Sequence, residues 1–275
     1  MKFLLGLALV AVGLFLVHAG SGSKGAAASQ DDARAEQAAP VDGARTPVLV
    51  ELFTSEGCSS CPPADALLAR FDQSQLVAGA QVIALEWHVD YWNYIGWRDP
   101  FSSAEYSARQ SAYAQSFGSN GVYTPQMVVD GRSEFVGSSE VRARSAISRS
   151  AGTAKPAIEL AQAGSGEKLS VRIPALSNAT IGDTPEIFLT LTESGLRSDV
   201  SRGENAGRHL EHTGVVREFL LLGRAQPSAS PAYATETSLQ LAPAWKRANL
   251  RAVVFVQERS SRRVLAAAFL PITSN

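Results

Sequence analysis

The sequence predicts an α/β domain over residues 46–153 followed by an all-β, sandwich-like domain over residues 156–275. Two observations support this fold class. In the first region, strand-length apolar runs alternate with segments that have a helical apolar face, which is typical of βαβ units. In the second region, short apolar runs recur between polar turns without a clear helix, which is typical of a β-sandwich.

The first strand and the first helix of the α/β region flank both cysteines of the chain. Residues 47–53 form a β-branched run of strand length, and residues 59–71 have apolar residues on one helical face. Two prolines fall in the first turn of this helix, where the backbone N–H groups lack helical partners in any case. Residues 81–89 are the next strand. A βαβ unit of this kind requires parallel strands joined by a crossover helix.

Two further helices and a hairpin complete the α/β region. Residues 102–117 predict a helix, and Ser102 and Glu105 have the spacing of a capping box at its start. Asp130-Gly131 is the strongest short hairpin signal in the chain, and it predicts an antiparallel strand pair. The two strands and the last helix are predicted over residues 122–129, 132–137 and 138–150.

The second region predicts short strands throughout. Polar turns separate the apolar runs, and no internal repeat is evident. The predicted strands cover residues 157–161, 169–176, 186–193, 215–223, 237–242, 251–258 and 264–271.

The beginning of the chain has the features of an exported protein. One Lys precedes an apolar run from Phe3 to Val17, and residues 1–19 end on a small residue. This layout predicts a secretory signal peptide, because the run is short for a spanning helix; an uncleaved anchor is the alternative. Residues 20–45 are rich in Gly, Ser, Ala and charge, so they predict a disordered linker. We therefore expect a periplasmic or secreted protein with no membrane attachment after signal cleavage.

The composition excludes one class of partner. Hydrophobic residues make up 45% of the chain and charged residues 19%, as in packed globular proteins. The formal net charge is −1, and no basic run stands out. Binding to nucleic acid, which requires many cationic contacts to phosphates, is therefore not expected.

Cys58 and Cys61 are the only cysteines of the chain, and they stand at the start of the first predicted helix. Unpaired N–H groups and the helix dipole favour negative charge there, and the thiolate is the reactive form of cysteine. We expect Cys58 to be the exposed, attacking sulfur. Cys61, three residues further on, is placed to resolve the mixed disulfide. The pattern predicts thiol–disulfide exchange.

The two sulfurs could also form a structural disulfide, a zinc site or a copper(I) site. A structural disulfide that closes so short a loop contributes only about 2 kcal/mol in the chain-entropy model. A structural zinc site needs four ligands, and no further cysteine supplies them. Copper(I) suits two thiolates and a thioether, and Met127 follows Pro125 by two residues. Met127 also fits a purely apolar core position.

The order β-α-β, α, β-β-α with Cys-Ser-Ser-Cys at the first helix resembles the thioredoxin fold. The resemblance implies a cis-proline at Pro125, which follows Thr124 and shapes the substrate groove opposite the disulfide. It also implies that Glu51, in the first strand, is a buried acid that moves the proton of Cys61. Strand alternation alone equally allows a solvated Glu51.

An aromatic loop follows the second strand. Trp87, Tyr91, Trp92, Tyr94 and Trp97 lie within eleven residues. Ligands of open α/β sheets bind beyond the carboxyl ends of the strands, so we expect this loop beside the cysteines. Tyr91, Trp92 and Trp97 are candidate substrate contacts, and a small satellite core under a long loop is the alternative. Three charged residues are expected to orient the loop: Asp90, Arg98 and Asp99.

The second region contains one unusually polar connection, "SRGENAGRHLEHTG". His209 and His212 have a spacing that allows a shared metal with Glu204 or Glu211, but hydrogen bonding in turns is the simpler use. Its other polar residues, Arg202, Glu204 and Asn205, are candidates for substrate binding or for contact with the first region.

Four segments together resemble an exported bacterial family catalogued only as a domain of unknown function: "VELFTSEGCSSCPPAD", "YWNYIGWRDPFSS", "YTPQMVVDG" and "RGENAGRHLEHTGVVRE". This resemblance implies the fold and export. The function expected from the residues is an exported thiol–disulfide oxidoreductase that acts on a protein or a small thiol or disulfide. We assign no cofactor and no metal ligand. The alternatives are a copper(I)-binding or copper-delivery protein, and a binding module with a structural disulfide.

Overall fold

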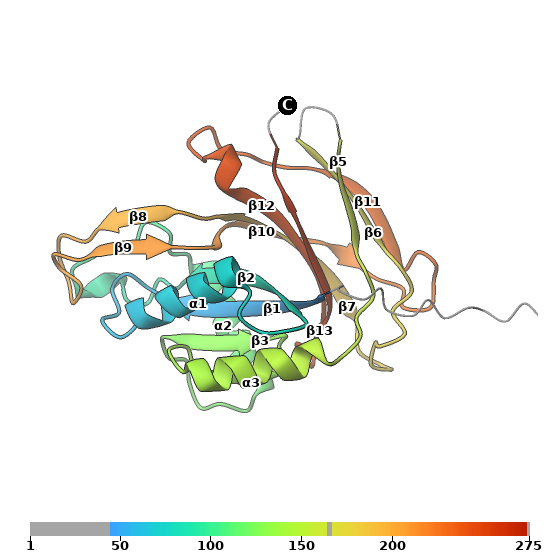
Figure 1. Ribbon diagram of the computed structural model, residues 1–275, viewed down its shortest axis with the longest axis horizontal. Helices are drawn as coiled ribbons and strands as arrows, with labels where there is room; N and C mark the ends of the chain where they lie inside the picture. The colour runs from blue at the N-terminus through green and yellow to red at the C-terminus, as the bar shows by residue number, and fades with distance from the viewer. Residues whose placement is uncertain (1–44, 164–166, 274–275) are drawn as a thin grey trace, which may run out of the picture. The chain divides into compact units, whose positions relative to one another are not determined.

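The computed structural model describes residues 45–163 and 167–273 (Figure 1). The predicted signal peptide, residues 1–19, and all but the last residue of the predicted linker, residues 20–45, lie outside this part. Within the described ranges, no helix has the length and apolar character needed to cross a bilayer.

The first region has the predicted order of elements. Parallel strands β1 and β2 are joined by helix α1, and β3 and β4 form an antiparallel hairpin whose first strand pairs with β1. The elements are β1 (Thr46–Thr54), α1 (Pro62–Ser74), β2 (Ala80–His88), α2 (Ala104–Ser116), β3 (Gln126–Val129), β4 (Ser133–Val136) and α3 (Glu140–Ala151).

The hairpin turn confirms the Asp-Gly signal. Asp130 and Gly131 both have positive φ values, 49° and 63°, as a type I′ turn requires. The N–H of Arg132 donates to the carbonyl of Val129 across the turn, at 3.0 Å. The capping box, in contrast, is placed one residue too early. Ser103, rather than Ser102, is the N-cap of α2 and accepts a hydrogen bond from the N–H of Glu105.

The second region consists almost entirely of strands, two of which the apolar pattern did not reveal. β8 and β9 form a polar hairpin whose strands are too short for their alternation of more and less exposed residues to predict them. β11 begins earlier than the predicted strand over residues 237–242. The strands are β5 (Glu159–Ala163), β6 (Lys168–Ile173), β7 (Pro185–Glu193), β8 (Leu196–Asp199), β9 (His209–His212), β10 (Val215–Arg224), β11 (Tyr233–Ser238), β12 (Leu250–Glu258) and β13 (Val264–Pro271).

The two regions share one eight-stranded sheet. Its order is β13-β12-β7-β10-β2-β1-β3-β4, and β10 joins β2 through a parallel contact between Val215 and Glu86. The fold is therefore mixed α/β around a large, mainly β sheet, whereas the sequence placed two separate sheets in two domains. The contact between β10 and β2 connects strands that are far apart in the sequence, so no local sequence pattern predicts it.

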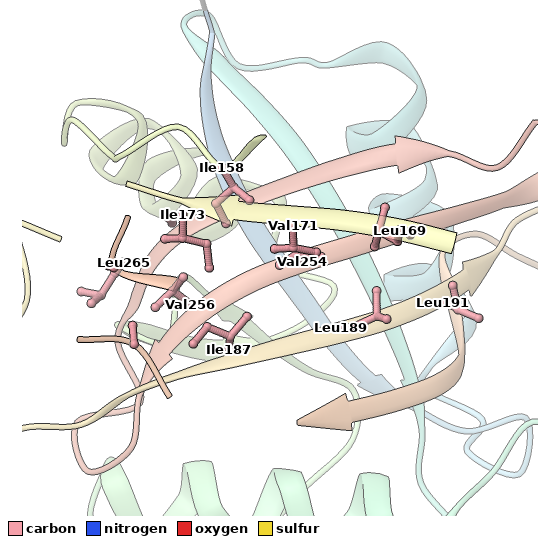
Figure 2. Close-up of a cluster of buried hydrophobic side chains, with 14 of the residues drawn as sticks. Ile158, Leu169, Val171, Ile173, Ile187, Leu189, Leu191, Val254, Val256 and Leu265 are labelled. Atoms are coloured by element: carbon pink, nitrogen blue, oxygen red, sulfur yellow. The ribbon is translucent and has the colours of Figure 1, made fainter. Parts of the chain in front are cut away.

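One face of the large sheet carries two hydrophobic cores. Over β1–β3, Val50 and Leu52 of β1 pack with Leu68 and Phe71 of α1 and Ile147 of α3. Over β7 and β12, a three-stranded sheet of β11, β6 and β5 covers the same face like the second layer of a sandwich. Figure 2 shows the residues that meet there: Ile158, Leu169, Val171, Ile173, Ile187, Leu189, Leu191, Val254, Val256 and Leu265.

The opposite face carries a third core that extends across both regions. Phe53 of β1 and Trp87 of β2 belong to the same cluster as Phe188 of β7 and Phe255 of β12, and Tyr113 of α2 covers them. Because successive side chains of a strand point to opposite faces, each strand contributes to both layers. The sheet is buried on both sides where it carries the candidate site.

The hairpin turn at Gly131 supplies a stability test. A Cβ at Gly131 would lie 1.8 Å from the carbonyl oxygen of Arg262, in the turn between β12 and β13. We expect Gly131→Ala to lower the free energy of unfolding by on the order of 3 kcal/mol, from the left-handed backbone and the overlap together. Gly79→Ala is the control, because Gly79 has φ +74° with no atom within 4 Å of its Cβ position. It should cost only about 1 kcal/mol in the same urea titration. Equal losses in the two variants would contradict the contact between the turns.

Candidate active site

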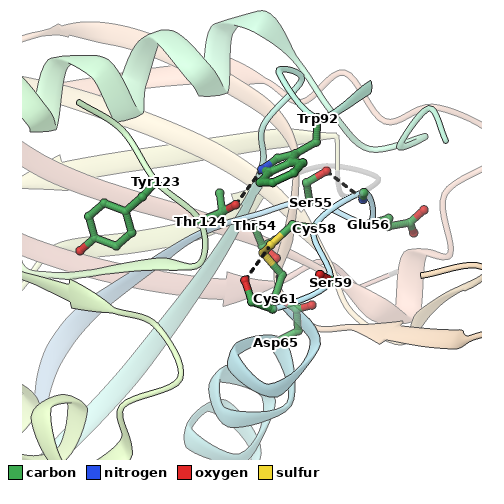
Figure 3. Close-up of a disulfide and its surroundings, with 12 residues drawn as sticks. Thr54, Ser55, Glu56, Cys58, Ser59, Cys61, Asp65, Trp92, Tyr123 and Thr124 are labelled. Carbon is green, nitrogen blue, oxygen red and sulfur yellow. Dashed lines mark hydrogen bonds between the residues drawn. A yellow bond between two sulfur atoms is a disulfide. The ribbon is translucent and has the colours of Figure 1, made fainter. Parts of the chain in front are cut away.

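Cys58 and Cys61 form a disulfide at the start of α1 (Figure 3). Cys61 is the N-cap of the helix, and its carbonyl accepts the N–H groups of Ala64 and Asp65. The prolines occupy the first two helical positions, as the sequence predicted. The sulfurs therefore lie at the positive end of the helix dipole, where a thiolate is favoured over a thiol.

The disulfide is buried, which corrects the expectation of an exposed Cys58. Cys58 is 1% exposed and Cys61 is fully covered. Trp92, from the loop after β2, lies beside the disulfide, and its indole N–H donates to the hydroxyl of Thr124 at 2.7 Å (Figure 3). A Cβ at Gly57 would stand 3.0 Å from the Cβ of Trp92, so this glycine lets the tryptophan approach the cysteine loop.

Thr124 and Pro125 lie next to the first turn of α1. The Thr124–Pro125 peptide bond is cis, as the resemblance implied for this position. A Cβ built on Gly137 would lie 3.2 Å from the Cβ atoms of both Pro125 and Ala64, so the proline and the helix meet at that glycine. Pro125 is buried and Thr124 half-buried. The structure thus brings both residues to the disulfide.

The polar connection between β8 and β9 is docked on the cysteine loop. Asn205 is fully buried, and its Nδ2 donates to the carbonyls of Glu56 and Cys58 at 2.8 and 3.0 Å. The exposed carboxylate of Glu204 accepts the N–H of Ser59 at 3.2 Å. The sequence allowed either substrate binding or contact with the first region for these residues. Asn205 and Glu204 make the contact with the first region, whereas Arg202 is exposed.

Glu51 does not lie where the sequence placed it. It is fully buried, which excludes a solvated glutamate, but it shares the α2 face of β1 with Leu49 and Phe53. Its Oε1 accepts the Nε–H of Arg109 at 2.7 Å, and its Oε2 accepts the hydroxyl of Tyr113. These partners come from α2, on the side of the sheet opposite to α1. Glu51 therefore anchors α2 and is not beside Cys61.

The buried acid on the disulfide side is Asp65. It lies one helical turn below Cys61, and the hydroxyl of Thr54 donates to its Oδ1 at 2.6 Å (Figure 3). Burial and the nearby charge of Glu86 raise the pKa of Asp65 from 3.8 to about 7. An acid of this kind exchanges its proton near neutral pH. The signal for it was present in the sequence, because Asp65 follows Cys61 by the four residues that place two side chains on one helical face.

A cluster of buried charges occupies the same face at the ends of β1 and β2. Alternation along β2 places Glu86 and His88 on this face, because Trp87 between them belongs to the core on the other side. Nδ1 of His88 lies 2.7 Å from Asp99, and Nδ1 of His212 lies 2.8 Å from Glu86. Carboxylates and imidazoles thus alternate beneath the cysteine loop.

Glu56 connects this cluster with the disulfide. Its Oε1 lies 3.1 Å from Nε2 of His212, and its Oε2 accepts the indole N–H of Trp97 at 2.7 Å. Its own N–H donates to Asp99 at 2.8 Å. Because Glu56 stands two residues before Cys58, the cluster fixes the backbone that leads into the disulfide.

The charges of the cluster stabilise one another. Burial alone would lower the pKa of His88, but the charge of Asp99 raises it to about 9. Burial likewise opposes ionisation of Glu86, yet His212 lowers its pKa to about 2. The charge of Glu86 in turn holds the pKa of His212 well above its usual value despite burial. The carboxylates thus favour the protonated form of both imidazoles.

The aromatic loop is held against the protein rather than presented to solvent. Tyr91 donates to Gln110 at 3.0 Å, and Trp92 and Trp97 make the bonds to Thr124 and Glu56 described above. All three rings are half-buried, whereas Tyr94 is 83% exposed. Asp99 orients the loop by accepting three hydrogen bonds, as the sequence predicted of a positioning residue.

The residues that the sequence offered as metal ligands, His209, His212 and Met127, do not lie together. His209 is exposed and lies 2.5 Å from Asp199, whereas its neighbour His212 points inward to the buried cluster. The two histidines therefore do not share a site. Met127 is fully buried in the core between the sheet and helices α1 and α3. It occupies the apolar position that strand alternation allowed.

A cavity of about 610 Å³ opens beside this face of the site, between α1 and the β8–β9 hairpin. Asp65 and Asp72 line it from the helix, and His212, Thr213 and Arg251 line it from the strands. Solvent in this cavity can therefore reach the edge of the buried cluster, although the disulfide itself is covered.

The fold and site together define a mixed α/β protein whose helix-capping cysteine pair lies above a buried charged cluster. The chain belongs to the family described as "Protein of unknown function (DUF1223)", which matches residues 49–257. The curated proteins contain no match to the sequence.

Two solved structures have a similar fold. Protein AGR_C_4864 from Agrobacterium tumefaciens is 27% identical, with a TM-score of 0.64 over 84% of this chain and 96% of that one. HBP35 of Porphyromonas gingivalis is 16% identical, with a TM-score of 0.61 over 83% of this chain and 76% of that one. The second likeness extends to the fold alone.

The partners of Glu51 predict a structural role for this residue. Glu51→Gln should lower the free energy of unfolding by about 3 kcal/mol, because Arg109 loses its buried counter-charge. The rate at which a small dithiol exchanges with the Cys58–Cys61 disulfide of the folded variant should stay that of the wild type. Glu140→Gln, which removes an exposed partner of Arg70 and Arg144, is the control and should leave stability nearly unchanged. A Glu51→Gln protein of normal stability but slowed exchange would restore the proton-transfer role.

The raised pKa of Asp65 predicts a pH-dependent stability. Between pH 4 and 7 the folded protein keeps a proton that the unfolded chain has released, so wild-type stability falls as pH rises through this interval. Asp65→Asn removes this loss, and its stability relative to the wild type should increase by on the order of 3 kcal/mol from pH 4 to pH 8. Asp72→Asn is the control in the same helix, because it breaks an ion pair with Arg251 and should destabilise throughout. Urea titrations at several pH values measure both, and parallel curves for Asp65→Asn and wild type would contradict the assignment.

Proposed function

We propose that the protein is an exported thiol–disulfide oxidoreductase with a thioredoxin-like catalytic half. The observation that carries the proposal is the Cys58–Cys61 disulfide at the N-terminus of α1, one turn from the buried acid Asp65. The cis bond before Pro125 and the β1-α1-β2 unit add to the likeness. The apolar run at the start of the chain supports export, and a disulfide is stable in an oxidising compartment.

The reaction transfers two electrons from a dithiol to a disulfide. In the reducing direction, the Cys58 thiolate attacks a substrate disulfide, and one substrate thiolate leaves as the mixed disulfide forms. The Cys61 thiolate then attacks the Cys58 sulfur, which re-forms the Cys58–Cys61 disulfide and releases the second substrate thiolate. Asp65 takes the proton of the Cys61 thiol, for which its pKa of about 7 is suited. The oxidising direction runs through the same steps in reverse.

Substrate access requires the cover of the disulfide to move. Trp92 is attached to Thr124 by one hydrogen bond between side chains, and its loop carries the exposed Tyr94. Release of that bond uncovers the sulfur of Cys58 while Asn205 still holds the cysteine backbone. The substrate then replaces Trp92 in the groove formed by Thr124 and Pro125. Tyr91 and Trp97 support the loop on either side.

The reduction potential of the pair is the first test. The purified protein is equilibrated in glutathione buffers, and the fraction of disulfide is measured. A potential between about −270 and −120 mV is expected for a redox enzyme, and its value gives the direction. A potential well below about −300 mV would mark a structural disulfide and favour the binding-module alternative.

Two cysteine variants test which sulfur attacks the substrate first. Cys61→Ser should accumulate a mixed disulfide between Cys58 and a disulfide reporter, because the resolving thiol is missing. Cys58→Ser should form far less of it, since Cys61 lies within the helix cap. Mass spectrometry of the trapped adducts distinguishes the two. Equal trapping in both variants would overturn the assignment of Cys58 as the nucleophile.

A further inference from the structure

We propose that Glu86, His88 and His212 form a binding site for one divalent cation of the zinc class, beneath the cysteine loop. One ligand atom from each residue lies within 4.8 Å of the others, and all three side chains are buried. Two come from β2 and the third from β9, so the site exists only because both regions share a sheet. The inference does not depend on the redox function.

The orientation of His88 supports a ligand role. Its Nδ1 faces Asp99 at 2.7 Å, the arrangement in which a carboxylate fixes a metal-binding imidazole with its other nitrogen toward the ion. That other nitrogen, Nε2, is buried and makes no hydrogen bond with any described atom. It lies 3.3 Å from Oε1 of Glu86 without hydrogen-bond geometry. The nitrogen is thus aimed into the cluster, where it has the ion-pair contact with Glu86 but no hydrogen bond among the described residues.

The separations fit a cation between the three groups. Zinc bonds of about 2.0–2.1 Å at tetrahedral angles place ligand atoms about 3.3 Å apart. His88 Nε2 lies 3.3 Å from Glu86 Oε1, which matches this separation, and His212 Nδ1 lies 2.8 Å from the same oxygen. All the ligand atoms lie within 4.8 Å of one another, so a cation between them requires the side chains to adjust. Two imidazoles and one carboxylate are also the ligand set of hydrolytic zinc centres, which keep one position open.

The charge of the cluster is compatible with a dication. Glu56, Glu86 and Asp99 place three carboxylates around two imidazoles. A divalent cation at this site therefore has buried counter-charges beside it. Access is provided by the cavity between α1 and the β8–β9 hairpin, because His212 and Thr213 line its wall.

The test is zinc binding by the oxidised, full-length protein. Keeping the Cys58–Cys61 disulfide intact removes thiolates from the competition. Titration calorimetry with Zn²⁺ alone should give one site per chain, and X-ray absorption at the zinc edge should give two imidazole nitrogens, oxygen and no sulfur. Absence of binding would show that protons alone hold the cluster and would overturn the proposal. A sulfur-containing or oxygen-only shell would overturn it as well.

Matched variants locate the site. His88→Gln and His212→Gln should each weaken zinc binding by at least about 100-fold, since each removes a ligand rather than only its support. His209→Gln is the control, because this exposed histidine lies on the same strand as His212 and should leave the affinity unchanged. An equal loss in the control would place the zinc on the surface instead. Where a variant fails to fold, the absorption spectrum of the wild type still decides.

Discussion

The contact between β10 and β2 determines where the second region's part of the candidate site lies. The N–H of Glu86 donates to the carbonyl of Gly214 at 2.8 Å, which ties the second region to the first. Gly214 has φ +69°, and a Cβ there would stand 2.6 Å from the carbonyl oxygen of Ala84, so only glycine allows this approach. Because β9 ends just before this point, the join brings His212 to Glu86 and Asn205 onto the cysteine loop.

Two buried acids of the first region, Glu51 of β1 and Asp65 of α1, lie on opposite sides of the sheet and differ in their chemistry. Glu51 points to the α2 face and meets the guanidinium of Arg109, which also lies over the rings of Trp87 and Phe219. This ion pair connects β1 with α2, and the guanidinium supplies the counter-charge of the Glu51 carboxylate. Asp65, on the other face, has only the hydroxyl of Thr54 as its side-chain partner. A buried carboxyl without a hydrogen-bonded cation retains its proton to higher pH, so the pKa of Asp65 is raised.

The sequence could predict what depends on neighbours along the chain. The turn at Asp130-Gly131 and the helix that begins at the cysteines follow from local signals, whereas the cis bond before Pro125 was expected only from the resemblance to the thioredoxin fold. The burial of Cys58 could not be predicted in this way, because its cover comes from Trp92 and from the loop of Asn205, far along the chain. The sheet shared by the two regions could not be predicted for the same reason. That Glu86 and His88 lie together in the buried cluster could be inferred only once the two faces of β2 were assigned.

Glu56 makes the disulfide and the charged cluster one unit. Its side chain lies between Trp97 and His212, its N–H is held by Asp99, and its carbonyl is held by Asn205. All four polar groups of this residue are therefore fixed by segments other than its own. A change of charge at His212, by loss of a proton or by binding of a cation, alters the bond to Glu56 and so acts on the backbone two residues before Cys58. The backbone that leads to the disulfide is thus connected to the buried cluster through the contacts of Glu56.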